Sequence, residues 1–155
     1  MPEDSIITDE MKAAIGVDSE PSVYEIEAEP IRRWSEAIGD SNPLYHDEAY
    51  AKSKGFRSLI APPGFIANYA FPVKSGGGGR RSFRSPFARM LNGGNEYEFF
   101  KPIQAGDTIT ATSNIADLRE REGRLGKMLF IISETTYKNQ DGEIVAKARG
   151  TGISY

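Results

Sequence analysis

The fold of this chain is decided by one apolar stretch, which reads Ile60-Ala61-Pro62-Pro63-Gly64-Phe65-Ile66-Ala67-Asn68-Tyr69-Ala70-Phe71-Pro72. Its prolines fix where regular structure begins and ends, because proline is tolerated in the first turn of a helix but not in its interior. Between the prolines the side chains are apolar on nearly every side. A helix with that pattern is buried rather than amphipathic. We therefore predict a central helix enclosed by the rest of the domain.

Four candidate strands follow this helix, at residues 96–100, 109–115, 128–132 and 144–149. Two of them, 109–115 and 144–149, alternate apolar and polar side chains, as strands with one buried face do. A turn signal at residues 139–142 is typical of a hairpin. A buried helix followed by antiparallel strands predicts an α+β domain with the sheet wrapped around the helix.

A second helix is predicted before the apolar stretch. It begins at Pro30, which suits the first position of a helix, and ends at Gly39. The spacing of Ile31, Trp34 and Ile38 places all three on one face.

The composition limits the chain to a few classes of protein. It has 155 residues, with 39% hydrophobic and 26% charged, so we expect one domain over residues 1–155. The absence of cysteine excludes disulfides and thiol nucleophiles, and with a single histidine we expect no metal site. The acidic N-terminus lacks the layout of a signal peptide, and no apolar run is long enough to cross a bilayer. We therefore expect a cytoplasmic protein with no membrane partner.

One segment of this chain is basic, although the net charge of the whole chain is −3. Residues 74–90 form a Gly- and Arg-rich insertion that contains Arg80, Arg81 and Arg84 and no acidic residue. A local patch of this kind can bind an anionic ligand even on an acidic protein. Nucleic acid is not an expected partner, because the patch is small and the whole chain is net acidic.

The segment Gly39-Asp40-Ser41-Asn42-Pro43-Leu44-Tyr45-His46-Asp47 holds the only histidine. Histidine is the side chain whose unperturbed pKa, about 6.5, suits proton transfer near neutral pH. His46 follows Asp40 by six residues across an Asn-Pro turn, so this loop is the first candidate for acid–base chemistry. The alternative is structural: His46 would be a surface residue, and Asp40 and Asn42 would form turns before Pro43.

Three segments, at residues 37–47, 61–65 and 100–107, together resemble the MaoC-like family of (R)-specific enoyl-CoA hydratases and 3-hydroxyacyl dehydratases. The closer match is the family's branch of N-terminal-type dehydratase domains. The resemblance implies a hotdog fold and a homodimer, or a heterodimer with another hotdog subunit. It also implies addition of water to trans-2-enoyl thioesters to give (R)-3-hydroxyacyl thioesters, or the reverse.

The resemblance implies roles for particular residues. Asp40 would orient and activate water, and His46 would act as general base and acid. Backbone N–H groups at the helix start would hold the thioester oxygen. The residues implied in substrate binding are Asn42, Tyr45, Pro63, Gly64, Phe65, Tyr69, Arg80, Arg81 and Arg84. No cofactor is implied, because coenzyme A or an acyl-carrier thioester enters as part of the substrate and brings phosphates within reach of the arginines.

One position departs from the catalytic pattern of that family, in which the histidine follows the aspartate by five residues. Tyr45 stands at that position here, and His46 comes one later. Two alternatives therefore stay open: an active hydratase, or a non-catalytic subunit that shapes the acyl channel of a heterodimeric dehydratase. A hotdog acyl-CoA thioesterase is a third.

Overall fold

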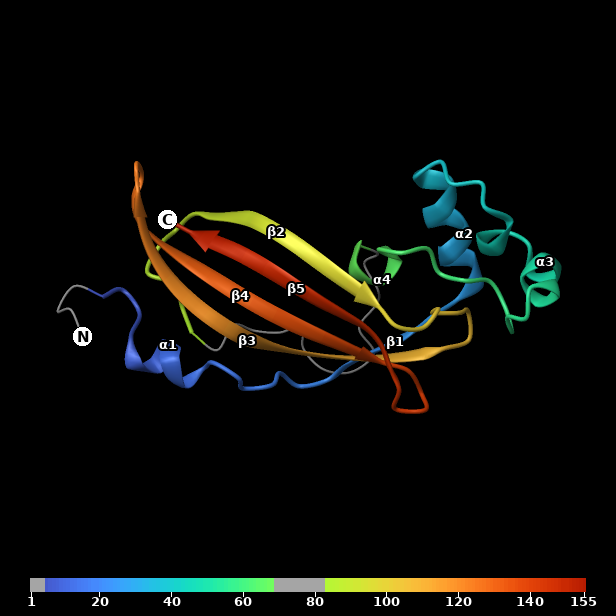
Figure 1. Ribbon diagram of the computed structural model, residues 1–155, viewed down its shortest axis with the longest axis horizontal. Helices are drawn as coiled ribbons and strands as arrows, with labels where there is room; N and C mark the ends of the chain where they lie inside the picture. The colour runs from blue at the N-terminus through green and yellow to red at the C-terminus, as the bar shows by residue number, and fades with distance from the viewer. Residues whose placement is uncertain (1–4, 69–82) are drawn as a thin grey trace.

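The computed structural model describes residues 5–68 and 83–155. Its helical elements come first in the chain and its long strands come last (Figure 1). The helices are α1 (Asp9–Ala13), α2 (Ala28–Ala37), the 3₁₀ turn η1 (Pro43–Tyr45), α3 (Glu48–Ser53) and α4 (Phe65–Asn68). The strands are β1 (Ser22–Glu25), β2 (Met90–Phe99), β3 (Thr108–Gly123), β4 (Gly126–Lys138) and β5 (Ile144–Ser154).

The strands form one antiparallel sheet in the order β1-β3-β4-β5-β2. The predicted turn at residues 139–142 is the β4–β5 hairpin, in which the Gly142 N–H donates to the Asn139 carbonyl at 3.0 Å. Gly142 adopts a φ of 75°, a conformation that only glycine adopts without strain. The order leaves β2, ten residues long, at one edge of the sheet.

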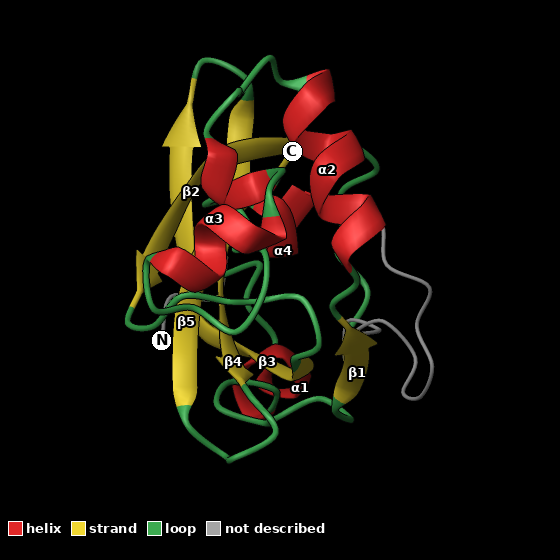
Figure 2. Cartoon of the chain, turned by 90° about the vertical axis from the view of Figure 1, so that its right-hand side faces the viewer, coloured by secondary structure: helices red, strands yellow, loops and turns green. Residues whose placement is uncertain are grey.

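Helices α2, α3 and α4 lie together at one end of the sheet, and α1 lies toward the other (Figures 1 and 2). The larger core cluster joins α2 and α4 to the sheet through residues such as Ile31, Phe65 and Ile109, which have no exposed side-chain surface. The Trp34 ring meets the Phe65 ring edge to face, with centroids 5.9 Å apart. A smaller cluster around Met11 packs α1 against β3 and β4.

The central helix begins where the prolines predict, since α4 starts directly after the Pro62-Pro63-Gly64 turn. Phe65 and Ile66 are buried, as expected of an enclosed helix. The rest of the predicted helix, from Tyr69 on, lies outside the described residues. None of the helices in the described ranges is long and apolar enough to cross a membrane.

The three residues on the predicted face of α2 differ in exposure. Ile31 is fully buried and Trp34 packs on the core, but Ile38 is 53% exposed. The helix ends at Ala37, and Ile38 is its C-cap. The Ile38 N–H still donates to the Trp34 carbonyl at 3.1 Å, so Ile38 keeps the helical spacing at the very end of the helix.

Candidate functional site

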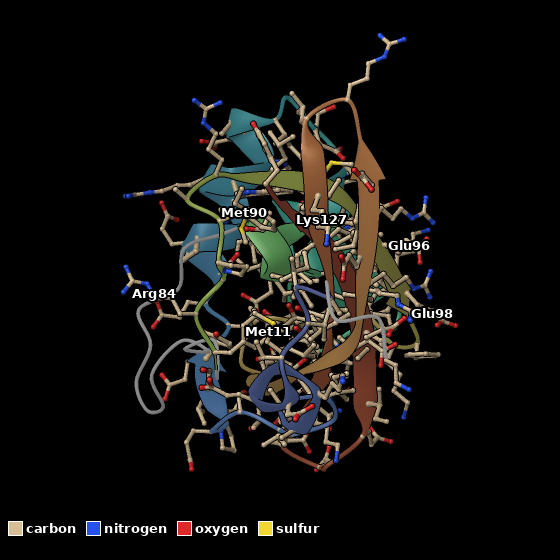
Figure 3. The ribbon with its side chains drawn as sticks, turned by 90° about the vertical axis from the view of Figure 1, so that its left-hand side faces the viewer. Met11, Arg84, Met90, Glu96, Glu98 and Lys127 are labelled. Carbon is tan, nitrogen blue, oxygen red and sulfur yellow. The ribbon has the colours of Figure 1, made fainter. Side chains whose placement is uncertain are left out.

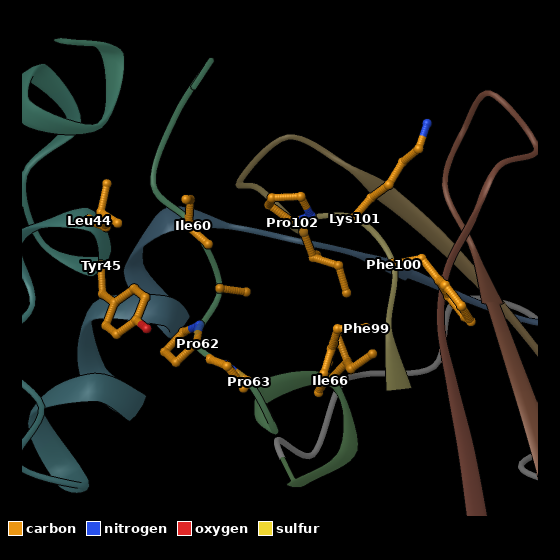
Figure 4. A pocket seen from close by; sticks show the side chains of 12 residues that line it. Leu44, Tyr45, Ile60, Pro62, Pro63, Ile66, Phe99, Phe100, Lys101 and Pro102 are labelled. Carbon is orange, nitrogen blue, oxygen red and sulfur yellow. The ribbon is translucent and has the colours of Figure 1, made fainter. Parts of the chain in front are cut away.

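An apolar pocket of about 330 Å³ opens between the loop at residues 44–45, the turn before α4, and the end of β2 (Figure 4). The turn contributes residues 60–63, and Ile66 follows from α4 itself. The opposite wall is residues 99–103. Tyr45 and Lys101 are the two lining residues with polar side chains, so the pocket suits an apolar chain with few polar atoms.

Local hydrogen bonds fold the loop that carries Tyr45. The Asn42 N–H donates to Asp40 Oδ1 at 3.0 Å, and the Leu44 N–H donates to Asn42 Oδ1 at 3.1 Å. These two Asx turns lead into η1, which Pro43 begins. The Ile60 N–H then donates to the Leu44 carbonyl at 3.0 Å and fixes the loop beside the turn that precedes α4.

Tyr45 is half-buried, and burial raises the pKa of its phenol. The negative charge of Asp40 adds to this rise, while a hydrogen bond from the Asn42 side chain opposes it. An ordinary tyrosine already titrates near pH 10. The Tyr45 hydroxyl is therefore protonated at neutral pH and can donate a hydrogen bond, but it cannot serve as a general base there.

His46 and Asp40 are in contact, but through the backbone. His46 Nε2 lies 2.7 Å from the Asp40 carbonyl oxygen. A carbonyl can only accept, so Nε2 carries the proton and donates. The Asp40 carboxylate instead accepts a hydrogen bond from the backbone N–H of Asn42. The structure brings the two residues together, but it does not place the imidazole on the carboxylate.

The pair lines a pocket of its own. Asp40 and His46 share it with Glu36, Gly39, Ser41, Pro43 and Asp47. Neither Asp40 nor His46 is among the residues that line the apolar pocket at the start of α4, where the loop contributes Leu44 and Tyr45 instead. The loop thus presents its side chains to two different pockets.

At the start of α4, one backbone N–H already donates a hydrogen bond within the preceding turn. Pro63 lines the apolar pocket, and Gly64 has a φ of 88°. The Phe65 N–H donates to the Pro62 carbonyl at 3.1 Å, so this amide is already used. The Phe65 side chain is fully buried in the core and does not line the pocket.

The remaining predicted residues do not meet at this pocket in the described structure. Arg84 is exposed, is not one of the pocket's lining residues, and its side chain projects away from the sheet (Figure 3). Tyr69, Arg80 and Arg81 lie outside the described residues. Within residues 5–68 and 83–155, no three His, Asp or Glu side chains are grouped so as to hold a metal ion.

Sequence reasoning missed the aromatic wall of the pocket. Phe99 and Phe100 line it and are 41% and 50% exposed. The signal was present in the sequence, because two phenylalanines precede Lys101-Pro102 at the end of a strand, where no core requires them both. Exposed neighbouring aromatics of this kind mark a binding surface.

This chain is similar in sequence to a dehydratase domain family and to several individual proteins. A family model described as FAS1-like, dehydratase domain region, matches residues 13–148. A UPF0336 protein of Thermobifida fusca is 35% identical over 120 residues, which is 74% of each chain. A Thermomonospora curvata protein named "Probable enoyl-CoA hydratase alpha subunit" is 31% identical over 136 residues, which covers 77% of this chain and 41% of that protein.

Solved structures match the fold at lower identity. The HadBC complex of Mycobacterium tuberculosis, a 3R-hydroxyacyl-ACP dehydratase, matches with a TM-score of 0.72 and 24% identity, covering 96% of this chain and 99% of that chain. A MaoC-like dehydratase of Rhodospirillum rubrum matches with a TM-score of 0.69 and 21% identity, covering 92% of each chain. The predicted hotdog fold of the MaoC-like type is confirmed.

Proposed function

Because this chain belongs to the family of the FAS1-like dehydratase domain region, we propose that it serves in the hydration and dehydration of acyl thioesters, as the subunit that walls the acyl pocket. A second hotdog subunit supplies the catalytic imidazole. The substrate is a trans-2-enoyl or (R)-3-hydroxyacyl thioester of coenzyme A or an acyl carrier protein. The reaction uses no further cofactor, and the compartment is the cytoplasm.

One observation carries this proposal: Tyr45, and not His46, lines the apolar pocket. Proton transfer to and from an acyl chain at neutral pH needs a group with a pKa near 7. The Tyr45 phenol, with its raised pKa, is not such a group. The His46 imidazole lines another pocket and donates its Nε2 proton to a backbone carbonyl.

The exposed edge of the sheet supports a second subunit. Every residue of β2 is exposed, and the side chains of Tyr97 and Phe99 are 40% and 41% exposed. A long edge strand with exposed aromatics is a place where another chain adds to the sheet. Phe99 also lines the pocket, so a subunit docked on this edge reaches the acyl site.

The names of the relatives, rather than charge, favour a partner that differs from this chain. Glu96 and Glu98 lie on β2 (Figure 3), but Arg149 and Lys147 lie directly opposite them on β5, so opposite charges already face each other across this pair of strands. The Thermomonospora relative is named a subunit, and HadBC is a complex of two chains, which agrees with this reading.

The purified chain tests the proposal with crotonyl-CoA, whose conjugated double bond loses its ultraviolet absorbance on hydration. We expect no turnover by the chain alone. Binding of the thioester is still expected, and is read from the fluorescence of Trp34, the single tryptophan. Turnover by the chain alone that disappears in His46→Ala would overturn the proposal.

Turnover that is lost in His46→Ala would establish the second candidate function, in which the chain is an active hydratase that uses Asp40 and His46. The 2.7 Å contact between the two residues and the pocket that they share favour it. The thioesterase alternative is separated in the same assay with a thiol-reactive dye. A thioesterase releases free coenzyme A, whereas a hydro-lyase releases none.

A further inference from the structure

One polar side-chain group, the Tyr45 hydroxyl, lies within the wall of the apolar pocket. Of its two polar lining residues, Lys101 points away from the cavity and forms an ion pair with Glu143 on the outside (Figure 4). The Tyr45 ring stands in the wall, with its hydroxyl directed toward Pro62 (Figure 4). The surrounding walls are carbon, from prolines, isoleucines and phenylalanines.

The loop around Tyr45 determines whether its hydroxyl donates or accepts each hydrogen bond. Asn42 Oδ1 accepts from the Leu44 N–H at 3.1 Å. The hydrogen bond between the Asn42 side chain and Tyr45 lowers the pKa of the phenol, as a bond donated by the Asn42 NH₂ group to the phenol oxygen does. The Tyr45 oxygen accepts this bond, and its own proton remains for another acceptor. Burial, which raises the pKa of this phenol, keeps the proton in place.

We propose that the Tyr45 hydroxyl is the specificity-determining donor of the pocket, and that it selects acyl ligands which present a hydrogen-bond-accepting oxygen at this wall. The inference rests on the proposed acyl pocket and adds the polar group that orients its occupant. A hydrogen-bond donor in an apolar pocket distinguishes ligands that can accept its bond from ligands that cannot. A ligand with an oxygen there gains a hydrogen bond, whereas a plain hydrocarbon leaves the hydroxyl without its water and without a partner.

Two oxygens of an acyl thioester have this chemistry, the thioester carbonyl and an oxygen at C3. Three thioester analogues of equal length separate them: S-butyl-CoA has neither oxygen, butyryl-CoA has the carbonyl, and (R)-3-hydroxybutyryl-CoA has both. The experiment measures their affinities by titration calorimetry for the wild type, Tyr45→Phe and Tyr50→Phe. Tyr50→Phe is the matched control, because Tyr50 lies on α3 and is not among the pocket's lining residues.

We expect Tyr45→Phe to weaken the ligands that carry the recognised oxygen by roughly two- to tenfold, the loss of one hydrogen bond. We expect S-butyl-CoA to bind this variant at least as tightly as the wild type, because no hydroxyl is then left without a partner. Loss with both oxygenated ligands identifies the carbonyl. Loss with the hydroxylated ligand alone identifies the oxygen at C3. We expect Tyr50→Phe to match the wild type throughout.

Two results would overturn the inference while the acyl pocket stands. One is that Tyr45→Phe binds all three ligands as the wild type does. The other is that it weakens all three equally, which would give Tyr45 a role in shape alone. If the wild type binds none of them, the acyl pocket itself fails and the inference fails with it. Unchanged thermal unfolding of Tyr45→Phe excludes misfolding as the cause of any loss.

Discussion

Tyr137 lies in the larger core cluster with 9% of its side chain exposed, and this burial raises the pKa of its hydroxyl to about 12. A tyrosine in the unfolded chain titrates near pH 10. The folded state therefore holds the proton more tightly. The free energy of unfolding is intact below about pH 10 and falls as the pH rises from there toward about 12. We expect a loss on the order of 2 kcal/mol, measured by urea unfolding across this range.

Replacing the phenol isolates its contribution. Tyr137→Phe keeps the ring in the core and removes the titrating group, so we expect its stability to change much less with pH over the same interval. Tyr50→Phe is the control, because Tyr50 is 37% exposed, and it should keep the slope of the wild type. A Tyr137→Phe variant that loses stability as steeply as the wild type contradicts this account.

The sequence predicts which residues share the loop of the candidate site, but not the direction in which each side chain points. The sequence places Asp40, Asn42, Tyr45 and His46 in one loop, and the structure keeps them within one set of hydrogen bonds. Which of them faces the acyl pocket could not be predicted. The 3₁₀ turn at Pro43–Tyr45 has about three residues per turn, so successive side chains differ by about 120° in direction. A shift of one residue therefore sends Tyr45 and His46 to different pockets.

At the scale of elements, the loop between β2 and β3 is held by a buried carboxylate. Asp107 is 4% exposed and accepts from the Gln104 N–H at 2.9 Å, the Gln140 side chain at 3.2 Å and Arg57 at 2.5 Å. Its carbonyl accepts from the Ile26 N–H at 2.9 Å. The residue thus joins the loop to the segment after β1, the turn after α3 and the β4–β5 hairpin.

We expect Asp107→Ala to lower the free energy of unfolding by about 2 kcal/mol, because it leaves the Gln104 N–H and the Gln140 amide without their acceptor. The Arg57 pair contributes less, since the Arg57 side chain is 61% exposed. Urea unfolding measures the change. Asp141→Ala removes an exposed carboxylate from the neighbouring hairpin and is expected to be near neutral. Equal effects of the two variants would contradict the role assigned to Asp107.

Element type was predictable from the sequence, but element length was not. The alternating pattern at residues 109–115 predicts a strand, yet β3 continues to Gly123 through a charged run. Backbone pairing with β4, from Thr110 opposite Lys138 to Gly123 opposite Gly126, sustains it, together with Leu118, which is buried in the smaller core cluster. In β2 the Asn92-Gly93-Gly94-Asn95 segment resembles a turn, but it is a register shift within the strand, with Gly94 at a φ of 151°.

At the scale of the whole molecule, the two edges of the sheet are unequal. One edge is β1, four residues long, and the other is β2, ten residues long and exposed throughout. Leu91 and Phe100 at either end of that edge are each 50% exposed. No sequence pattern tells which strand will be an edge, because strand order depends on pairings between distant segments. The structure is needed to find this surface, on which the proposed second subunit docks.

A charge placed on this edge tests whether it is an interface. We expect the chain, when no other hotdog subunit is present, to associate weakly with itself through β2, since an unpaired apolar edge still favours pairing over exposure. Leu91→Lys adds a cation to the seam and should weaken this association at least tenfold, measured by sedimentation equilibrium. The expected loss reflects burial of an unpaired charge in place of an apolar side chain.

Leu125→Lys provides the matched control, because Leu125 is 69% exposed in the turn between β3 and β4, and β5 separates these two strands from β2 in the sheet. It should associate as the wild type does. If Leu91→Lys and the wild type associate equally, β2 is not the seam and the second subunit must approach the acyl pocket from another side.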